Sequence, residues 1–136
     1  MYEYKISNIR IVDGDTIDAD IDLGFGLMMR ERIRLFGINT PETRTRDKAE
    51  KKKGLAAKKR LEELLEKSES GITVQTQFDS RGKFGRILGT LYSYIKHPGD
   101  DFFERKSSVK VDINHQLISE GHAEIYKPWF YNTLWT

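Results

Sequence analysis

The clearest pattern in the chain is the strict alternation Ile17-Asp18-Ala19-Asp20-Ile21-Asp22-Leu23. Successive side chains of a β-strand point to opposite faces, so the apolar residues share one face and the aspartates share the other. The segment is therefore predicted to be a half-buried antiparallel strand. Turn chemistry flanks it, Asp13-Gly14 before it and Gly24-Phe25-Gly26 after it. With strands over 2–12 and 27–35, it is predicted to form a three-stranded meander.

The rest of the chain adds one long helix and more strands. Residues 47–67 are rich in Ala, Leu, Lys and Glu and lack proline, which favours a helix. Two further strands are predicted over 72–78 and 86–95, then an irregular loop over 97–108. A short helix follows over 113–121, where Gly121 closes it. Five short strands with a helix between the third and fourth predict an α+β, mainly β fold: a five-stranded OB-type barrel with flanking helices.

Length and composition narrow the class of protein. The 136 residues predict a single domain over 1–136, and 32% charged residues without a long apolar run argue against a membrane protein. The N-terminal sequence shows no signal peptide, so a cytoplasmic protein is expected, compatible with a phage-encoded enzyme. The absence of cysteine excludes disulfides and thiolate ligands, and the three histidines lack His-Glu-x-x-His spacing. Any metal must therefore be held mainly by oxygen.

Charge is unevenly distributed, although the net charge is only +2. Residues 13–22 carry five aspartates and no base, whereas residues 44–60 carry nine Lys and Arg against two acids. Each run can be interpreted as a solvated face. A basic helix start, however, opposes the helix dipole, and this favours an anionic partner.

Three segments place polar groups at the ends of predicted strands: Val12-Asp13-Gly14-Asp15-Thr16, Arg34-Leu35-Phe36-Gly37-Ile38-Asn39-Thr40-Pro41-Glu42 and Lys83-Phe84-Gly85-Arg86. They offer oxygen ligands for a hard divalent cation, namely Asp15, Asn39, Glu42 and the Thr40 carbonyl. They also offer two guanidinium groups, Arg34 and Arg86. A cation beside two such groups suits phosphodiester cleavage, because both stabilise charge that develops on phosphoryl oxygens.

These segments resemble the V-x-D-G-D-T, R-L-x-x-x-D-T-P-E and K-Y-G-R motifs of the thermonuclease (staphylococcal-nuclease-like) family, in the same order and with a helix after the second. The likeness extends over roughly residues 3–128, and the segment 114–123 is similar to the family's N-x-x-L-[IV]-x-x-G-x-A helix. The resemblance implies an OB-type barrel with three helices and Ca²⁺-dependent hydrolysis of DNA or RNA. It further implies the following roles: metal binding by Asp15, Asn39 and Thr40, a position near the attacking water for Glu42, phosphate binding by Arg34 and Arg86, and nucleic-acid binding by Lys83 and Tyr126.

The chain departs from the family pattern at the second metal ligand. Asn39 stands where the family has aspartate, and its amide oxygen carries no charge, so weaker Ca²⁺ binding is expected. Tyr126 is the best match to the family's nucleotide-stacking tyrosines. An alternative function is a catalytically weakened OB-fold module that binds nucleic acid through a positive groove and aromatic stacking. A monomer is the default expectation.

Several residues have a simpler interpretation. Asp13 can serve as a turn residue or as part of the site. Asp18, Asp20 and Asp22 are interpreted as the exposed face of their strand, and the aromatic residues 129, 130 and 135 as packing anchors.

Overall fold

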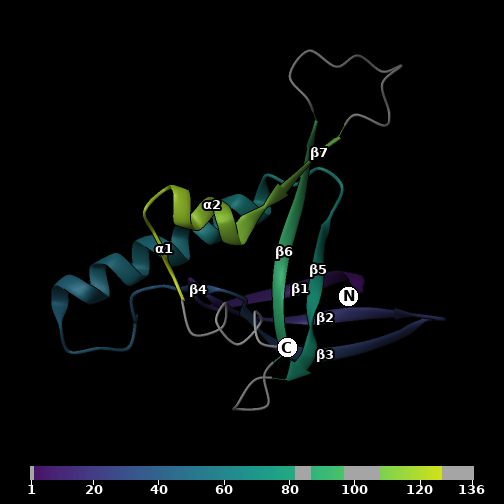
Figure 1. The fold of residues 1–136 in the computed structure, drawn as a ribbon, viewed down its shortest axis with the longest axis horizontal. Helices are drawn as coiled ribbons and strands as arrows, with labels where there is room; N and C mark the ends of the chain where they lie inside the picture. The colour runs from purple at the N-terminus through teal and green to yellow at the C-terminus, as the bar shows by residue number, and fades with distance from the viewer. Residues whose placement is uncertain (1, 82–86, 97–107, 127–136) are drawn as a thin grey trace.

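The computed structural model describes residues 2–81, 87–96 and 108–126, and within them the chain forms a strand-rich body with two helices (Figure 1). The strands and helices are, in chain order, β1 Glu3–Asp13, β2 Thr16–Gly24, β3 Leu27–Leu35, β4 Ile38–Asn39, α1 Lys48–Glu66, β5 Ile72–Arg81, β6 Ile87–Lys96, β7 Ser108–Asp112, α2 Ile113–Ser119 and β8 Glu124–Ile125. The five predicted strands and the long helix are present with their ends shifted by up to three residues.

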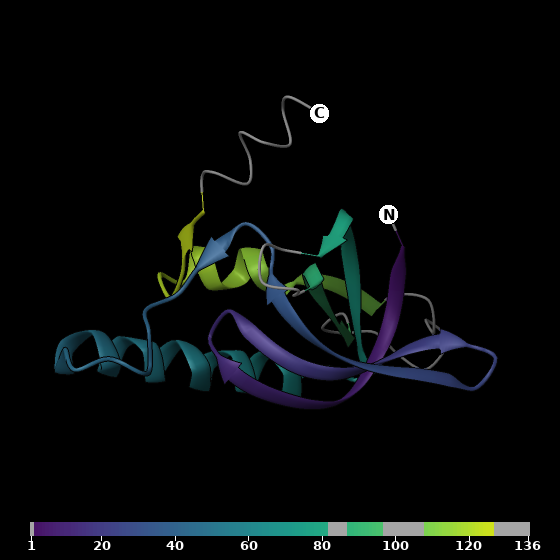
Figure 2. The ribbon, with the colours of Figure 1, turned by 90° about the horizontal axis from the view of Figure 1, so that it is seen from below.

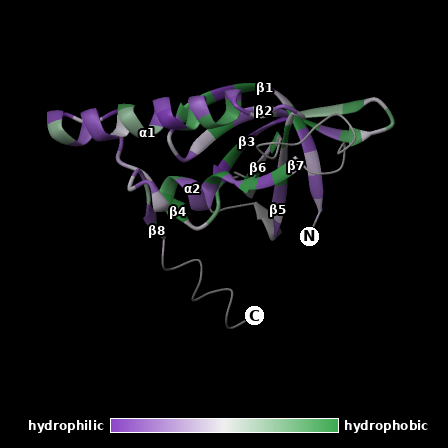
Figure 3. Cartoon of the chain, turned by 90° about the horizontal axis from the view of Figure 1, so that it is seen from above, coloured by the Kyte–Doolittle hydropathy of each residue, from purple (hydrophilic) through white to green (hydrophobic). Residues whose placement is uncertain are grey.

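The sheet closes into a five-stranded barrel, as predicted. β1, β2 and β3 form the antiparallel meander, β5 pairs with the first part of β1, and β6 pairs with β5. Parallel pairing between residues 33–35 of β3 and 87–89 of β6 completes the ring. The first part of β3 therefore lies outside the ring, and the β2–β3 hairpin projects away from α1, with an apolar tip that is green in Figure 3.

Alternating apolar residues fill the barrel. Ile17 and Ile33 are directly opposite each other in β2 and β3 and are fully buried. α1 lies beside β1 and β2 (Figure 2) and buries one side of its helix, formed by Ala57, Leu61 and Leu64. α1 thus covers the barrel from the side that carries the β1–β2 turn. No helix in the described part of the chain combines the length and the apolar character needed to cross a lipid bilayer.

The aspartates of β2 form a ladder of ion pairs, and the interpretation that they are simply an exposed strand face was incomplete. The antiparallel register places Asp18 opposite Arg32 and Asp20 opposite Arg30, and both pairs are in contact, at 2.8 and 2.9 Å. The hydrogen bond from Arg32 lowers the pKa of Asp18. Asn8, in the left-handed conformation at a bulge of β1, donates to Asp20 and is the main cause of its lowered pKa.

Two sequence-based expectations need correction. Two helices, rather than three, are present in the described residues, and 127–136 lie outside them. Residues 97–108 were predicted as an irregular loop, but Ser108 begins β7, which pairs with residues 92–96 of β6. Residues 97–107 lie outside the described ranges.

α2 follows its predicted pattern and packs on the barrel through three buried side chains, Ile113, Asn114 and Leu117. Asn114 is 4% exposed; its Oδ1 accepts from the Leu91 amide, and its Nδ2 donates to the carbonyl oxygens of Phe36 and Gly89. Gly121, at φ +83°, reverses the chain directly after the helix, as expected of a helix-ending glycine. The segment after it then forms β8, which pairs with β4.

Candidate active site

Asp15 joins the β1–β2 turn to the loop that follows β4. The residue is 8% exposed, and each of its carboxylate oxygens accepts a hydrogen bond: Oδ1 from the Thr16 hydroxyl at 2.9 Å and Oδ2 from the Thr40 amide at 3.0 Å. Sequence analysis placed Asp15 and Thr40 in one site, and the structure brings them into direct contact across 25 positions of the chain.

Arg34 lies near the end of β3 and is 7% exposed. Its guanidinium contacts the side chains of Asp15 and Asn39. Its Nη2 is 3.3 Å from Asp15 Oδ2 and donates to Asn39 Oδ1 at 3.2 Å. Its Nη1 donates to the carbonyl oxygens of Asp15 and Leu35, at 3.3 and 3.2 Å. A rigid guanidinium can make these contacts at once because its donors spread in one plane. The guanidinium of Arg34 therefore contacts the charged carboxylate of Asp15 and the neutral amide oxygen of Asn39.

The oxygen atoms present at this place are of the kind that a hard cation binds. Asp15 and Asn39 offer carboxylate and amide oxygens, and Thr40 Oγ1 is buried without a hydrogen-bond partner in the part of the chain that the structure describes. No group of three or more His, Cys, Asp or Glu side chains in the described residues is placed to hold a metal. Two of the predicted ligands, Asp15 and Asn39, are therefore brought together, and Arg34 contacts both.

Glu42 opens onto a hollow of about 820 Å³. Asn39 and Thr40 line the same hollow, whose other walls come from α1 and from the segment after α2, namely Pro41, Asp47, Ala49, Glu50, Lys53, Ala56, Gly121, His122, Ala123 and Glu124. Glu42 is exposed, whereas Asp15 and Arg34 are buried. The hollow therefore gives a substrate access to a carboxylate and to two of the predicted cation ligands.

Two glycines allow this packing: Gly14, which was predicted only as a turn residue, and Gly54, which was not predicted to have a role. A Cβ on Gly14 would lie 2.9 Å from Ala57 Cβ and 3.1 Å from Thr40 Oγ1. A Cβ on Gly54 would lie 2.6 Å from the Glu42 carbonyl oxygen. The signal for Gly54 was available: a glycine inside a helical pattern costs about 1 kcal/mol relative to alanine and usually has a packing reason.

The remaining predicted site residues are placed less completely. Arg86 and Lys83 lie outside the described residues. Tyr126 is half-buried directly after β8, and its amide donates to the Gly37 carbonyl oxygen at 2.8 Å. This bond fixes the backbone of Tyr126 beside the turn that leads into β4. Its expected role in stacking on bases stays a prediction.

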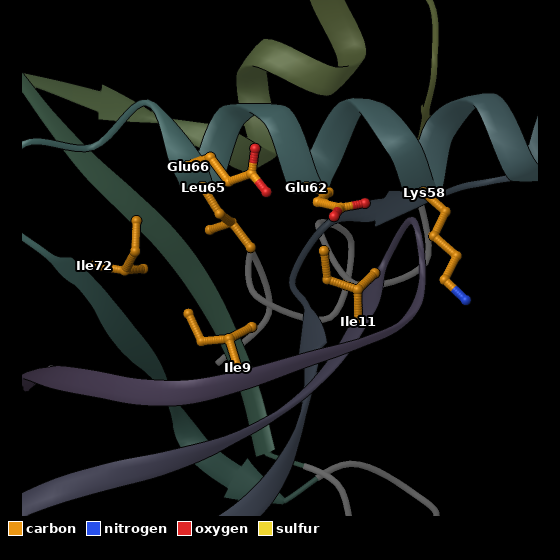
Figure 4. Close-up of a pocket in the computed structure, with 7 residues that line it drawn as sticks. All are labelled: Ile9, Ile11, Lys58, Glu62, Leu65, Glu66 and Ile72. Atoms are coloured by element: carbon orange, nitrogen blue, oxygen red, sulfur yellow. The ribbon is translucent and has the colours of Figure 1, made fainter.

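A second, smaller groove of about 440 Å³ lies between β1 and α1 (Figure 4). It is lined by Ile9, Ile11, Lys58, Glu62, Leu65, Glu66 and Ile72. None of the predicted site residues borders it.

Comparisons with known proteins assign the chain to one family. Residues 32–134 match the family described as Staphylococcal nuclease homologue. The micrococcal nuclease of Shigella flexneri is 31% identical over 127 residues, an alignment that covers 92% of this chain. The barrel with its buried Arg34 and Asp15 belongs to the nuclease-type OB folds, and the chain is a member of the staphylococcal nuclease homologue family. It spans 60% of the length of the Shigella protein.

Proposed function

We propose that this protein is a calcium-dependent nuclease that hydrolyses phosphodiester bonds of DNA or RNA. The observation that carries the proposal is the contact of Arg34 with both Asp15 and Asn39 beside the hollow onto which Glu42 opens. Membership of the nuclease family and the relative named a micrococcal nuclease support it.

The cation would be held by Asp15, Asn39 and Thr40. When bound, it would supply positive charge beside the scissile phosphate. Because Asn39 is neutral, the proposed ligand set carries less negative charge than a set with carboxylates at both positions 15 and 39 would carry.

Arg34 is the phosphate-binding residue of the described site. One of its partners, Asn39 Oδ1, is a neutral oxygen, and a charged phosphate oxygen is the stronger acceptor for a guanidinium. A phosphate that enters the hollow can therefore replace the bond to Asn39, while the contact with Asp15 keeps Arg34 in place. The family resemblance implies the same role for Arg86, which lies outside the described residues.

Glu42 either deprotonates the attacking water or orients it. Its exposure lets water reach the carboxylate directly. Since proton transfer requires a base within hydrogen-bond reach of the water, the direction of the Glu42 side chain matters for the rate.

A catalytically weakened nucleic-acid-binding barrel is the second candidate function. The neutral Asn39 favours it, because a metal that binds poorly would leave binding without hydrolysis. The two candidates differ in whether they need the carboxylate of Glu42, which a phosphate-binding groove would not require.

The test is digestion of plasmid DNA, single-stranded DNA and RNA in parallel with Ca²⁺, Mg²⁺, Mn²⁺ or EDTA. The nuclease is expected to cleave at least one substrate with Ca²⁺ and none in EDTA. Glu42→Gln should keep binding and lose cleavage by about 10²-fold or more. Binding of nucleic acid with no cleavage under any metal would favour the binding module. Equal activity in Ca²⁺ and EDTA would refute calcium dependence.

A further inference from the structure

No described residue holds the side chain of Glu42 in place. It is exposed, and its carboxylate has neither a hydrogen bond nor an ion pair with any residue that the structure describes. Its direction is therefore set by the backbone of the loop that carries it. Whatever holds residues 41–43 also determines where this carboxylate points.

The β1–β2 turn holds the loop from one side. The hydroxyl of Thr43, directly after Glu42, donates a hydrogen bond to Asp13 Oδ1. Asp13 ends β1 and pairs with Thr16 of β2, so its backbone is part of the barrel. The turn that presents Asp15 to the predicted cation site thus also holds the residue next to Glu42.

Helix α1 supports the loop from the other side, through Gly54. A Cβ at this position would lie 2.6 Å from the carbonyl oxygen of Glu42, 2.7 Å from that of Pro41 and 2.8 Å from the carbonyl carbon of Glu42. All three neighbours are backbone atoms, so no side-chain rotation could relieve the contact. Glycine here lets the loop rest directly on the helix.

From these contacts we propose that Asp13, Thr43 and Gly54 are positioning residues for Glu42, forming a clamp between the β1–β2 turn and α1. The role in turnover rests on the proposed nuclease function, because it concerns the same carboxylate. Pro41 adds to the clamp, since the proline ring fixes one backbone angle of the residue before Glu42. None of the three clamp residues needs to touch the substrate.

The direct test compares Thr43→Val, which removes the hydroxyl at constant size, with Thr43→Ser, which keeps it. Thr43→Val should lower kcat by about tenfold to a hundredfold, the scale of a 1 Å displacement, with little change in KM or in Ca²⁺ affinity by calorimetry. Thr43→Ser should restore most of the turnover. Thr45→Val is the matched control and should keep wild-type kcat, because the Thr45 hydroxyl accepts from the nearby Asp47 amide and bonds no other group that the structure describes.

Gly54→Ala tests the opposite side of the clamp. It should lower kcat with KM retained, although alanine is the better helix former. Hydrogen exchange of the Thr40 and Asp47 amides, which lie at the two ends of this loop and donate to Asp15 and Thr45, reports the clamp independently of activity when it is measured without substrate. Thr43→Val and Gly54→Ala should accelerate this exchange while protection of the barrel strands is kept.

Each part of the proposal can fail separately. Unchanged exchange in both variants would overturn the clamp, and accelerated exchange with wild-type kcat would overturn its role in positioning Glu42. If the wild-type protein cleaves no nucleic acid with any metal, the proposed function fails. The exchange measurement then still decides whether Thr43 and Gly54 hold the loop.

Discussion

Arg34 donates a hydrogen bond to the side-chain oxygen of Asn39 at 3.2 Å. This contact links a buried cation to the position where the chain departs from its family by carrying an amide in place of a carboxylate. The same nitrogen, Nη2, lies 3.3 Å from Asp15 Oδ2, so one guanidinium group contacts both a carboxylate and an amide. Arg34 is thus held in place by both side chains.

Replacing Asn39 by aspartate should tighten Ca²⁺ binding, because ligand charge is a main determinant of affinity at hard-cation sites. Calorimetric Ca²⁺ titration should give a lower Kd, and half-maximal cleavage should need less Ca²⁺. From the sequence alone, the added carboxylate would be expected to repel Asp15 and destabilise the metal-free protein. Since Arg34 lies 3.2 Å from this position, the Tm in EDTA should instead stay within about 4 °C of wild type, a shift of roughly 1 kcal/mol.

Asp15→Ala is the control for this experiment and should abolish both Ca²⁺ binding and cleavage. An unchanged Ca²⁺ affinity in Asn39→Asp, with wild-type protein that cleaves well, would show that Asn39 does not bind the metal.

Arg34→Lys should reduce kcat by about 10²- to 10³-fold, the loss typical of removing one transition-state donor. Lysine keeps the charge but lacks the planar set of N–H donors with which a guanidinium can contact Asn39 and a phosphate at the same time. The assay is run below the Tm of both proteins. Arg32→Lys, two residues earlier on β3, is the matched control, because Arg32 pairs with Asp18 on the outer face. Similar activity losses in the two variants would argue against a special role for Arg34.

The exposed lysines of the first turns of α1 should contribute a sequence-independent contact with phosphate. Replacing Lys51, Lys52 and Lys53 by glutamine should weaken binding of single-stranded DNA in EDTA. The slope of log K against log salt should become shallower by about 2, that is, about 0.7 per lost contact. The control is Lys5→Gln with Lys67→Gln, both away from the hollow. An unchanged slope in the triple variant would mean that this helix face is merely solvated.

The ion pair between Arg60 and Glu120 should make stability depend on pH. Hydrogen bonds from Arg60 and then Gln116 lower the pKa of Glu120 from 4.5 to about 2. Because the folded-state pKa is the lower one, the stabilisation is complete above about pH 4.5 and is lost as the pH falls through 2.

Urea denaturation of Glu120→Gln should therefore show a deficit of at most about 1 kcal/mol at pH 7, since the pair is partly exposed, and the deficit should shrink toward zero near pH 2. Glu62→Gln, which removes a carboxylate without an ion-pair partner among the described residues, should leave stability unchanged at both pH values. A deficit for Glu120→Gln that persists at pH 2 would contradict the linkage.

The barrel was predictable because short stretches of the sequence specify its strands and turns. Alternation in residues 17–23 and the glycines at 24 and 26 define β2, its turn and the register with β3, and the same register pairs Asp18 with Arg32. That ion-pair ladder could have been found by pairing the two alternating segments around their turn. β7 was missed because a five-residue strand between longer segments is recognisable mainly from its partner, β6.

The sequence by itself determined the alternating strands, the helix predicted over 47–67 and the order of the motifs that contain Asp15, Arg34, Asn39 and Glu42. Only the tertiary structure decided how these groups contact one another. Arg34 bonds Asn39, Thr43 bonds Asp13, and Gly54 lies against the Glu42 backbone because closing the barrel brings the β1–β2 turn, the end of β3 and α1 together. These contacts join residues up to 30 positions apart. Hydrophobic patterning specifies which face of each strand is buried, whereas a contact between turns depends on where whole strands and a helix end in space, and no local pattern encodes that.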